Sequence, residues 1–314
     1  MAKIPIIDTH CDLIIPYQDL KEKFGRATKK TQTSLALLKK TNVKIIFAGF
    51  SYDDLLKNSS QQLEDLHKMI GEYPKDFELI TDFKKVPKIL KSTKIGVILH
   101  IEGAGILNNK IDNLIGLYNN GLRSLGLTHN TKNCLGTGAL IDNKKGLTKF
   151  GKKVIEKCNE LGIIIDLSHL NEKGFYESLL VSKRPVIISH GNCFSVTPNP
   201  RNFKDDQLKQ IAKIGSIVGI FFSGKFLNPQ MDAKKATIDN AILHIDHMVK
   251  IMGIDHIAIG SDFGGITTGL PQGLENHPTL LVLFKKLRER GYTQKDIEKI
   301  AFKNALRAIR QSTI

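Results

Sequence analysis

The sequence predicts an α/β fold of the (β/α)8 class, a TIM barrel, as a single domain over residues 1–314. Three observations lead to this prediction. Short apolar runs alternate with amphipathic segments along the whole chain. The apolar runs are continuous, which is typical of parallel strands that are buried on both faces. Eight runs fit one barrel of this length, and no linker or low-complexity stretch divides the chain.

The predicted strands follow one another in chain order. They are residues 4–9, 43–50, 95–102, 122–128, 162–168, 185–190, 216–222 and 256–262. Helical spacing of apolar residues predicts helices between them, for example 59–71, 111–120, 148–161, 205–214 and 237–252. Two further predicted helices, 278–290 and 294–310, complete the barrel.

Composition and charge exclude several classes of function. Hydrophobic residues make up 41% of the chain and charged residues 25%, as in ordinary globular proteins. The net charge of +15 comes mainly from lysines spread along the chain, without an arginine-rich arm or zinc finger, so no nucleic-acid partner is expected. No apolar run approaches the roughly 20 residues of a membrane helix, so no membrane partner is expected either. Four scattered cysteines without a CxxC spacing favour a cytoplasmic location.

Six of the eight predicted strands end in residues that can bind metal or transfer protons. These strand ends read DTHCD, HIEG, LTHN, DLSH, ISHGN and GSDFGG. Active sites of such barrels lie at the carboxyl ends of the strands. The site residues expected at this rim are His10, Asp12, Glu102, His129, His169, His190 and Asp262. Alternation along the first strand also predicts that Asp8 shares a face with His10 and Asp12.

The chemistry of this set points to metal. Imidazole and carboxylate groups are the ligands that zinc prefers in catalytic sites. Three histidines, one aspartate and one glutamate are too many for one tetrahedral ion. They suit two ions about 3.5–4 Å apart that share a bridging carboxylate and a hydroxide.

The motifs DTHCDL, HIEG, LTHN, DLSH, ISHGNCFSVTPNPRN and GSDFGG resemble those of the membrane dipeptidase family, in order and over nearly the whole chain. The resemblance implies a barrel of the metal-dependent hydrolase type that binds two zinc ions and hydrolyses dipeptides. A dipeptide with a free carboxyl-terminal carboxylate is the expected substrate, with tolerance of a D-residue at that end. The sequence leaves the oligomeric state open, a homodimer included.

The resemblance also implies a role for each site residue. His10 and Asp12 hold one zinc ion, His169 and His190 hold the other, and Glu102 bridges them together with a hydroxide. His129 polarises and binds the substrate, Arg201 binds its carboxylate with a planar guanidinium, and Asp262 is the acid/base that moves the proton.

Two other functions stay open. The segment TKNCLGTGAL after His129 departs from the family pattern, so another metal-dependent amidohydrolase, acting on an N-acyl amino acid, a lactone or a cyclic amide, is the main alternative. A non-catalytic basic binding protein is the other. Among the remaining histidines, His100 is interpreted as a packing or supporting residue, and His244 and His247 as part of a helix surface.

Overall fold

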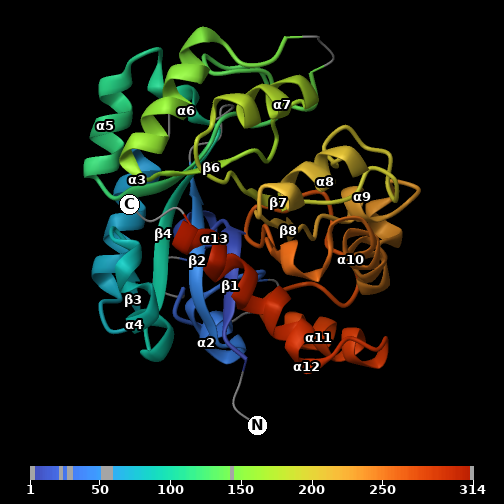
Figure 1. The fold of residues 1–314 in the computed structure, drawn as a ribbon. Coiled ribbons are helices and arrows are strands. Elements are labelled where there is room, and N and C mark those ends of the chain that lie inside the picture. Colours follow the sequence, from blue (N-terminus) through green and yellow to red (C-terminus); the bar gives the residue numbers. More distant parts are fainter. Residues whose placement is uncertain (1–3, 21–23, 27–30, 51–58, 142–144, 312–314) are drawn as a thin grey trace.

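The structure, a computed structural model, describes residues 4–20, 24–26, 31–50, 59–141 and 145–311 (Figure 1). Its centre is a parallel sheet whose strands follow the order β6-β5-β4-β2-β1-β9-β8-β7. A parallel bridge between Asp166 and Ile187 joins the two ends of this order and closes the ring. The predicted (β/α)8 barrel is therefore confirmed. Its strands are β1 (Ile6–Cys11), β2 (Val43–Phe50), β4 (Ile95–Glu102), β5 (Leu122–Gly126), β6 (Ile164–Asp166), β7 (Ile188–Gly191), β8 (Val218–Ile220) and β9 (Ile257–Ile259).

One strand was not predicted. β3 (Phe77–Leu79) lies off the ring and pairs in parallel with the beginning of β4. Its three residues are too short a run for any periodicity to be recognised.

Helices surround the ring. Six of them match predicted segments: α3 (Ser59–Glu72), α5 (Ile111–Asn119), α6 (Lys149–Leu161), α8 (Asp205–Lys213), α10 (Ile238–Met252) and α11 (Leu280–Glu289). Five more were not predicted: α1 (Ile14–Leu20), α2 (Leu35–Thr41), α4 (Val86–Lys91), α7 (Glu172–Val181) and α9 (Gly224–Leu227). Short 3₁₀ turns occupy Phe83–Lys85, Ala104–Leu107, Ala233–Lys235, Ile254–His256 and His277–Thr279.

The predicted helix 294–310 is interrupted. It consists of α12 (Gln294–Glu298), a π-helical turn over Lys299–Lys303 and α13 (Asn304–Gln311). α13 packs against β1 and β9, and Figure 1 shows it crossing the strands near the centre of the barrel. Ala305 and Ile309 belong to one buried cluster with Ile7 and Ile45, which lie early in their strands. α13 therefore covers the amino-terminal end of the barrel, opposite the predicted site.

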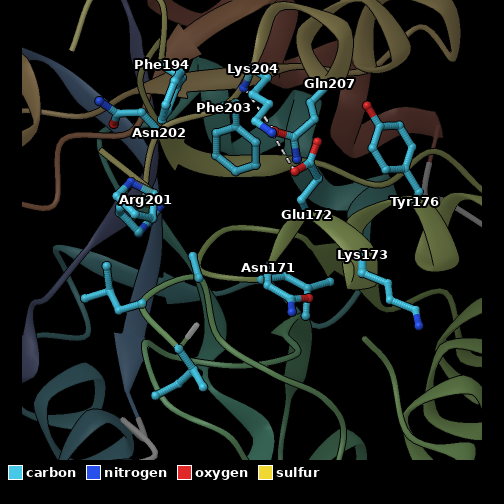
Figure 2. Close-up of a pocket in the computed structure, with 15 residues that line it drawn as sticks. Asn171, Glu172, Lys173, Tyr176, Phe194, Arg201, Asn202, Phe203, Lys204 and Gln207 are labelled. Carbon is cyan, nitrogen blue, oxygen red and sulfur yellow. Dashed lines mark hydrogen bonds and ion pairs between the residues drawn. The ribbon is translucent and has the colours of Figure 1, made fainter. Parts of the chain in front are cut away.

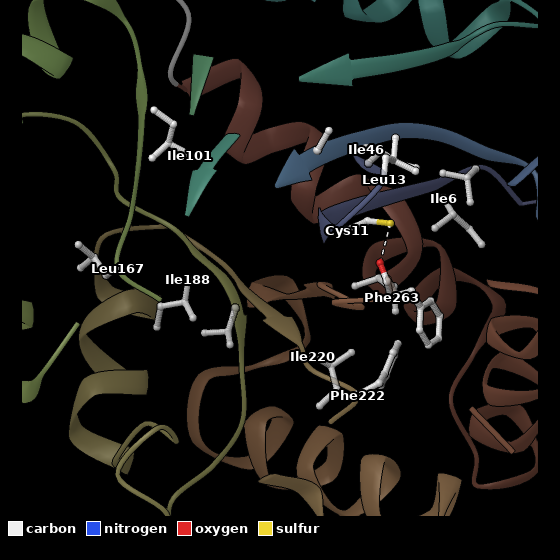
Figure 3. Close-up of a cluster of buried hydrophobic side chains, with 14 of the residues drawn as sticks. Ile6, Cys11, Leu13, Ile46, Ile101, Leu167, Ile188, Ile220, Phe222 and Phe263 are labelled. Atoms are coloured by element: carbon white, nitrogen blue, oxygen red, sulfur yellow. Dashed lines mark hydrogen bonds between the residues drawn. The ribbon is translucent and has the colours of Figure 1, made fainter. Parts of the chain in front are cut away.

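A larger apolar cluster fills the space between the ring and its helices. It includes Ile6, Ile46 and Ile188 from the strands and Phe222 and Phe263 from the segments that follow β8 and β9 (Figure 3). In this cluster the thiol of Cys11 donates to the carbonyl oxygen of Phe263 at 3.1 Å. This close packing outside the ring restrains the backbone at the strand ends. Side chains that point into the ring are therefore attached to a rigid backbone.

Candidate metal centre

The imidazole of His10 lies near the carboxyl end of β1 and is fully buried. Neither of its ring nitrogens forms a hydrogen bond to a residue that the structure describes. Three carboxylate oxygens surround its Nε2: Asp262 Oδ1 at 3.5 Å, Glu102 Oε1 at 3.6 Å and Asp12 Oδ2 at 3.8 Å. Buried polar nitrogens usually have partners, and buried carboxylates need a cation. A metal ion fits both requirements.

Glu102, the last residue of β4, lies at the middle of the cluster. Its Oε1 is 2.8 Å from Nε2 of His169 and 3.3 Å from Nε2 of His190. The two Nε2 atoms are 2.8 Å apart. Together with His10, three imidazole nitrogens therefore face one carboxylate oxygen. The donor set and its burial suit metal binding around Glu102.

The hydrogen bonds of His190 fix which ring nitrogen faces the cluster. Its Nδ1 is 2.9 Å from Oγ of Ser189, and that hydroxyl donates to Oδ2 of Asp166 at 2.6 Å. Because the only hydroxyl proton of Ser189 goes to the carboxylate, Nδ1 of His190 is the donor in the other contact. Nε2 then carries a lone pair and is available to a metal ion.

Two further residues lie beside the cluster. His129 follows β5, and the centroid of its ring is 4.5 Å from the ring centroid of His169. Arg201 is fully buried; its Nε lies 3.1 Å from Nδ1 of His169, which is also 2.8 Å from Oδ1 of Asn130, and its Nη2 donates to the carbonyl oxygen of His190 at 3.2 Å. Its Nη1 is buried without a hydrogen-bond partner among the described residues. This nitrogen is available to an anion.

The backbone is strained at two of these positions. Among the described residues with positive φ are Asp262 at 59° and His169 at 63°, although neither is a glycine. This left-handed conformation is uncommon for residues with a side chain, and such strain gathers at functional sites. The amide of Asp262 donates to the carbonyl oxygen of His10 at 2.9 Å, which helps to hold the turn.

Two glycines leave room for the carboxylate of Asp12. A Cβ atom at Gly265 would lie 2.0 Å from Asp12 Oδ2, and one at Gly49 would lie 2.7 Å from Asp12 Oδ1. Any larger residue would displace this carboxylate. The GSDFGG motif therefore supplies both Asp262 and the space that Asp12 needs.

Burial controls the charges of the site. It lowers the pKa of His10, His169 and His190 well below the ordinary value, with nearby cationic groups adding to the effect. Burial also raises the pKa of Asp262 well above its usual range, and the carboxylates of Asp12 and Glu102 raise it further. Neutral imidazoles are the form that binds metal, and a bound cation would relieve the repulsion between the acids.

The prediction that Asp8 shares a face with His10 and Asp12 is wrong. The pairing of β1 with β2 is irregular between Asp8 and Cys11, so the side chains do not alternate there. Asp8 accepts hydrogen bonds from Ser261 and from Nε2 of His277, and its carboxylate lies within 4.8 Å of the sulfur of Cys11. Sequence reasoning did not select His277, because no motif surrounds it.

His100 is fully buried outside the cluster of carboxylates. Its Nδ1 is 2.9 Å from Oγ of Ser124, and its Nε2 is 3.5 Å from Oδ2 of Asp166. Its ring lies edge-on to that of His10, with 5.2 Å between the centroids. This arrangement agrees with the interpretation of His100 as a supporting residue.

The interpretation of His244 as a surface residue is wrong. His244 is fully buried on α10, where its Nδ1 accepts from the amide of Cys193 at 3.0 Å and its Nε2 donates to the carbonyl oxygen of Leu227 at 3.1 Å. Burial lowers the pKa of His244 to about 4. His247 is partly buried and contacts Asp205 at 2.7 Å. Neither histidine belongs to the metal centre.

A pocket of 830 Å³ lies beside the site and shares Arg201 with it (Figure 2). The segment after His129 contributes Leu140 and Ile141 to its wall, and both side chains are partly exposed. Across the pocket, Lys204 forms an ion pair with Glu172 at 2.7 Å, close to the labelled ring of Phe203 in Figure 2. Part of the segment after His129 that departs from the family pattern, at Ala139 and Leu140, therefore lines a pocket next to Arg201.

Comparison with known proteins places this site in a family. The family model for membrane dipeptidases, peptidase family M19, matches residues 1–313. The chain belongs to this family. A curated relative, an uncharacterized protein in the pqqA 5′ region of Klebsiella pneumoniae, is 34% identical over 257 residues, covering 80% of this chain and 94% of the relative.

Solved members of the membrane dipeptidase family have the same fold. Dipeptidase AC, a metallopeptidase of family M19, matches with a TM-score of 0.91 at 26% identity over 99% of each chain. A metallopeptidase from Rhodobacter sphaeroides, solved with a phosphinate mimic of the dipeptide L-Ala-D-Ala, matches with a TM-score of 0.91 at 25% identity over 99% of each chain. The protein is a metallo-dipeptidase. Within the described part of this dipeptidase, no helix has the length and apolar character needed to cross a membrane.

Proposed function

We propose that this metallo-dipeptidase uses two zinc ions to hydrolyse dipeptides that carry a free carboxyl-terminal carboxylate. One ion would be held by His10 and Asp12, the other by His169 and His190, and Glu102 would bridge them. The observation that carries the proposal is the approach of three imidazole Nε2 atoms to Glu102 Oε1, at 2.8, 3.3 and 3.6 Å.

The ions, when bound, supply a hydroxide nucleophile at neutral pH, because they lower the pKa of bound water. The remaining steps fall to side chains. Asp262 takes the nucleophile's proton and delivers it to the leaving amine; burial raises the pKa of this carboxyl above its usual range, which favours proton uptake. His129 donates to the oxygen of the scissile carbonyl as negative charge develops there.

Arg201 is the proposed partner of the substrate carboxylate. A buried donor without a partner costs about 1–3 kcal/mol, and Nη1 of Arg201 is such a donor among the described residues. A carboxylate would satisfy it with a charge-assisted hydrogen bond. Tolerance of a D-residue at the carboxyl-terminal position is proposed from the Rhodobacter sphaeroides metallopeptidase, which was solved with a mimic of L-Ala-D-Ala.

We also propose a reducing, cytoplasmic location for the enzyme. All four cysteines are free, and three of them are buried. Scattered free thiols of this kind are usual in a compartment that keeps cysteines reduced.

One substrate panel tests the proposal. The metal-free protein, reconstituted with zero, one or two equivalents of zinc, is assayed against L-Ala-L-Ala, L-Ala-D-Ala, N-acetyl-L-alanine and a lactone. Activity on the dipeptides that reaches its maximum at two equivalents is expected. Preference for the N-acetyl amino acid or the lactone would replace the dipeptidase by the amidohydrolase alternative. Full activity at one equivalent would overturn the two-ion mechanism.

A further inference from the structure

The barrel consists of two blocks of paired strands that meet at two seams. One block contains β7, β8 and β9, and the other contains β6, β5, β4, β2 and β1. Within the larger block, β2 and β4 pair at six consecutive positions, from Ile45 to Phe50. At the seams the pairing is short: β1 and β9 pair at Asp8↔Ile259, with a separate bridge at Cys11↔Phe263, and β6 meets β7 through Asp166↔Ile187.

The candidate metal centre spans both seams. His190 and Asp262 come from the smaller block, whereas His10, Glu102 and His169 come from the larger one. Main-chain hydrogen bonds cross the first seam from Asp262 to His10 and from Asp12 to Phe263, each at 2.9 Å, and buried side chains add a further connection between the two sets of ligands.

At the first seam a buried carboxylate supplies this connection. Oδ1 of Asp8 on β1 accepts from the amide of Ser261 at 2.9 Å, and its Oδ2 accepts from the hydroxyl of the same serine at 2.5 Å. Oδ1 also accepts from the amide of His10 at 3.3 Å, and Oδ2 from Nε2 of His277 at 3.0 Å. Ser261 directly precedes Asp262.

The second seam repeats this arrangement. Oδ1 of Asp166 on β6 accepts from the amide of Ser189 at 2.8 Å, and its Oδ2 accepts from the hydroxyl of that serine at 2.6 Å. Oδ1 also accepts from the amide of Ser168 at 3.0 Å, and Nε2 of His100 lies 3.5 Å from Oδ2. Ser189 directly precedes His190.

We propose that Asp8 and Asp166 are positioning residues, each of which clasps one seam of the barrel and thereby sets the geometry of one metal ion. This inference rests on the proposed two-ion site. The Asp8–Ser261 clasp connects His10 with Asp262, and the Asp166–Ser189 clasp connects the segment of His169 with His190.

Two features support the proposal: the burial of the aspartates and the position of each serine in the chain. Both aspartates are buried, with side-chain exposures of 0% and 1%, so their hydrogen bonds are shielded from water. Each serine is covalently next to a site residue, so a shift of the serine moves that residue directly. The Asp8 clasp therefore acts on the ion of His10 and Asp12, and the Asp166 clasp acts on the ion of His169 and His190. A metal site tolerates deviations of only about 0.2 Å in ligand distance.

Removal of one hydroxyl at a time tests the proposal. The variants are Ser261→Ala and Ser189→Ala; the control is Ser178→Ala, which removes a buried hydroxyl that bonds only within α7. Metal-free proteins are titrated with zinc against a chromophoric chelator, and anomalous scattering from crystals at limiting zinc assigns occupancy to each position. Thermal unfolding of the metal-free forms reports the change in fold stability separately.

Ser261→Ala is expected to weaken the ion beside His10 by about 10–100-fold, and Ser189→Ala the ion beside His169 by a similar factor, with the other ion affected less. Ser178→Ala should leave both affinities unchanged. Equal weakening of both ions by both variants, or lower stability with unchanged zinc affinities, would overturn the clasps. Wild-type protein that binds fewer than two ions would instead overturn the proposed function, and the assignment of the clasps with it. If an alanine variant does not fold, the corresponding serine-to-cysteine variant, which keeps a weaker donor, is titrated and should show a smaller loss at the same ion.

Discussion

A single methyl group at Gly265 should displace a proposed metal ligand while leaving the barrel folded. In Gly265→Ala the added Cβ would lie 2.0 Å from Oδ2 of Asp12 and 3.0 Å from its Cγ. Ordinary van der Waals contact begins at 3.4 Å, so the carboxylate oxygen must move by about 1.4 Å (3.4 minus 2.0). The tolerance of a coordination distance is only about 0.2 Å. Asp12 can no longer coordinate an ion held by His10.

The cost to folding should be much smaller than the cost to metal binding. The atoms in the way are the carboxylate of Asp12 and, at 3.1 Å, Oδ1 of Asp262, both of them ends of short side chains that can rotate without a shift of the backbone. We expect zinc affinity at the His10 position to fall by at least about 100-fold. This is more than the loss expected when a residue that only hydrogen-bonds to a metal ligand is removed. Gly49→Ala should show a weaker effect, because its Cβ would lie 2.7 Å from Oδ1 of Asp12.

The assay is zinc stoichiometry by mass spectrometry after dialysis, together with kcat/KM for L-Ala-D-Ala and the melting temperature of the metal-free protein. Gly116→Ala is the matched control, because it adds a methyl group on α5 that comes within 4 Å of no atom beyond its chain neighbours and the backbone of its own helix. It should retain the wild-type stoichiometry and gain up to about 1 kcal/mol in stability. Two tightly bound zinc ions in Gly265→Ala would refute the assignment of Asp12 as a ligand.

Three other variants separate the remaining roles. Asp262→Asn should reduce kcat by on the order of 10²-fold or more while retaining zinc, since an amide cannot return a proton; loss of both ions would make Asp262 a ligand. Arg201→Lys should raise KM for dipeptides by about 10–100-fold, with little effect on substrates without a free carboxylate; equal losses on both would contradict the assignment. The folded pKa of His244, about 4, lies below its ordinary 6.5, so below pH 6.5 the unfolded state binds a proton that the folded state does not. Stability should therefore fall by up to about 3 kcal/mol as the pH drops from 6.5 to 4. Urea unfolding should show this loss reduced in His244→Gln; an unchanged pH dependence would contradict it.

The sequence was sufficient to predict both the barrel and the convergence of the candidate residues, because both follow from the parallel arrangement of the strands. Parallel strands point their carboxyl ends to the same rim, so residues that follow strands must converge wherever they lie in the chain. Glu102 and His190 are 88 residues apart (190 minus 102), yet their side-chain atoms lie 3.3 Å from each other. The motifs at the strand ends required no knowledge of packing.

Predictions that depend on local backbone geometry were less successful. The alternation rule placed Asp8 beside His10, but the irregular pairing between Asp8 and Cys11 turns its carboxylate away. The i, i+3 spacing of His244 and His247 on α10 gave no indication of which one is buried, because both neighbour apolar and charged residues. The π-helical turn over Lys299–Lys303 has no proline or glycine that would mark it in the sequence.

The pocket beside Arg201 depends on contacts between segments that the sequence alone does not reveal. The pocket beside Arg201 is formed by Leu140 and Ile141 after β5, by the first turn of α7 and by the segment around Phe203. No periodicity or motif predicts that these three segments meet. The amide of Ala139 donates to the carbonyl oxygen of His169 at 2.7 Å, which connects the segment after β5 with the beginning of α7, and the ion pair of Lys204 with Glu172 connects α7 with the segment around Phe203. The strained residue that faces Glu102 therefore also anchors the wall of the pocket. A change in this segment would alter the wall of the pocket without changing any proposed metal ligand.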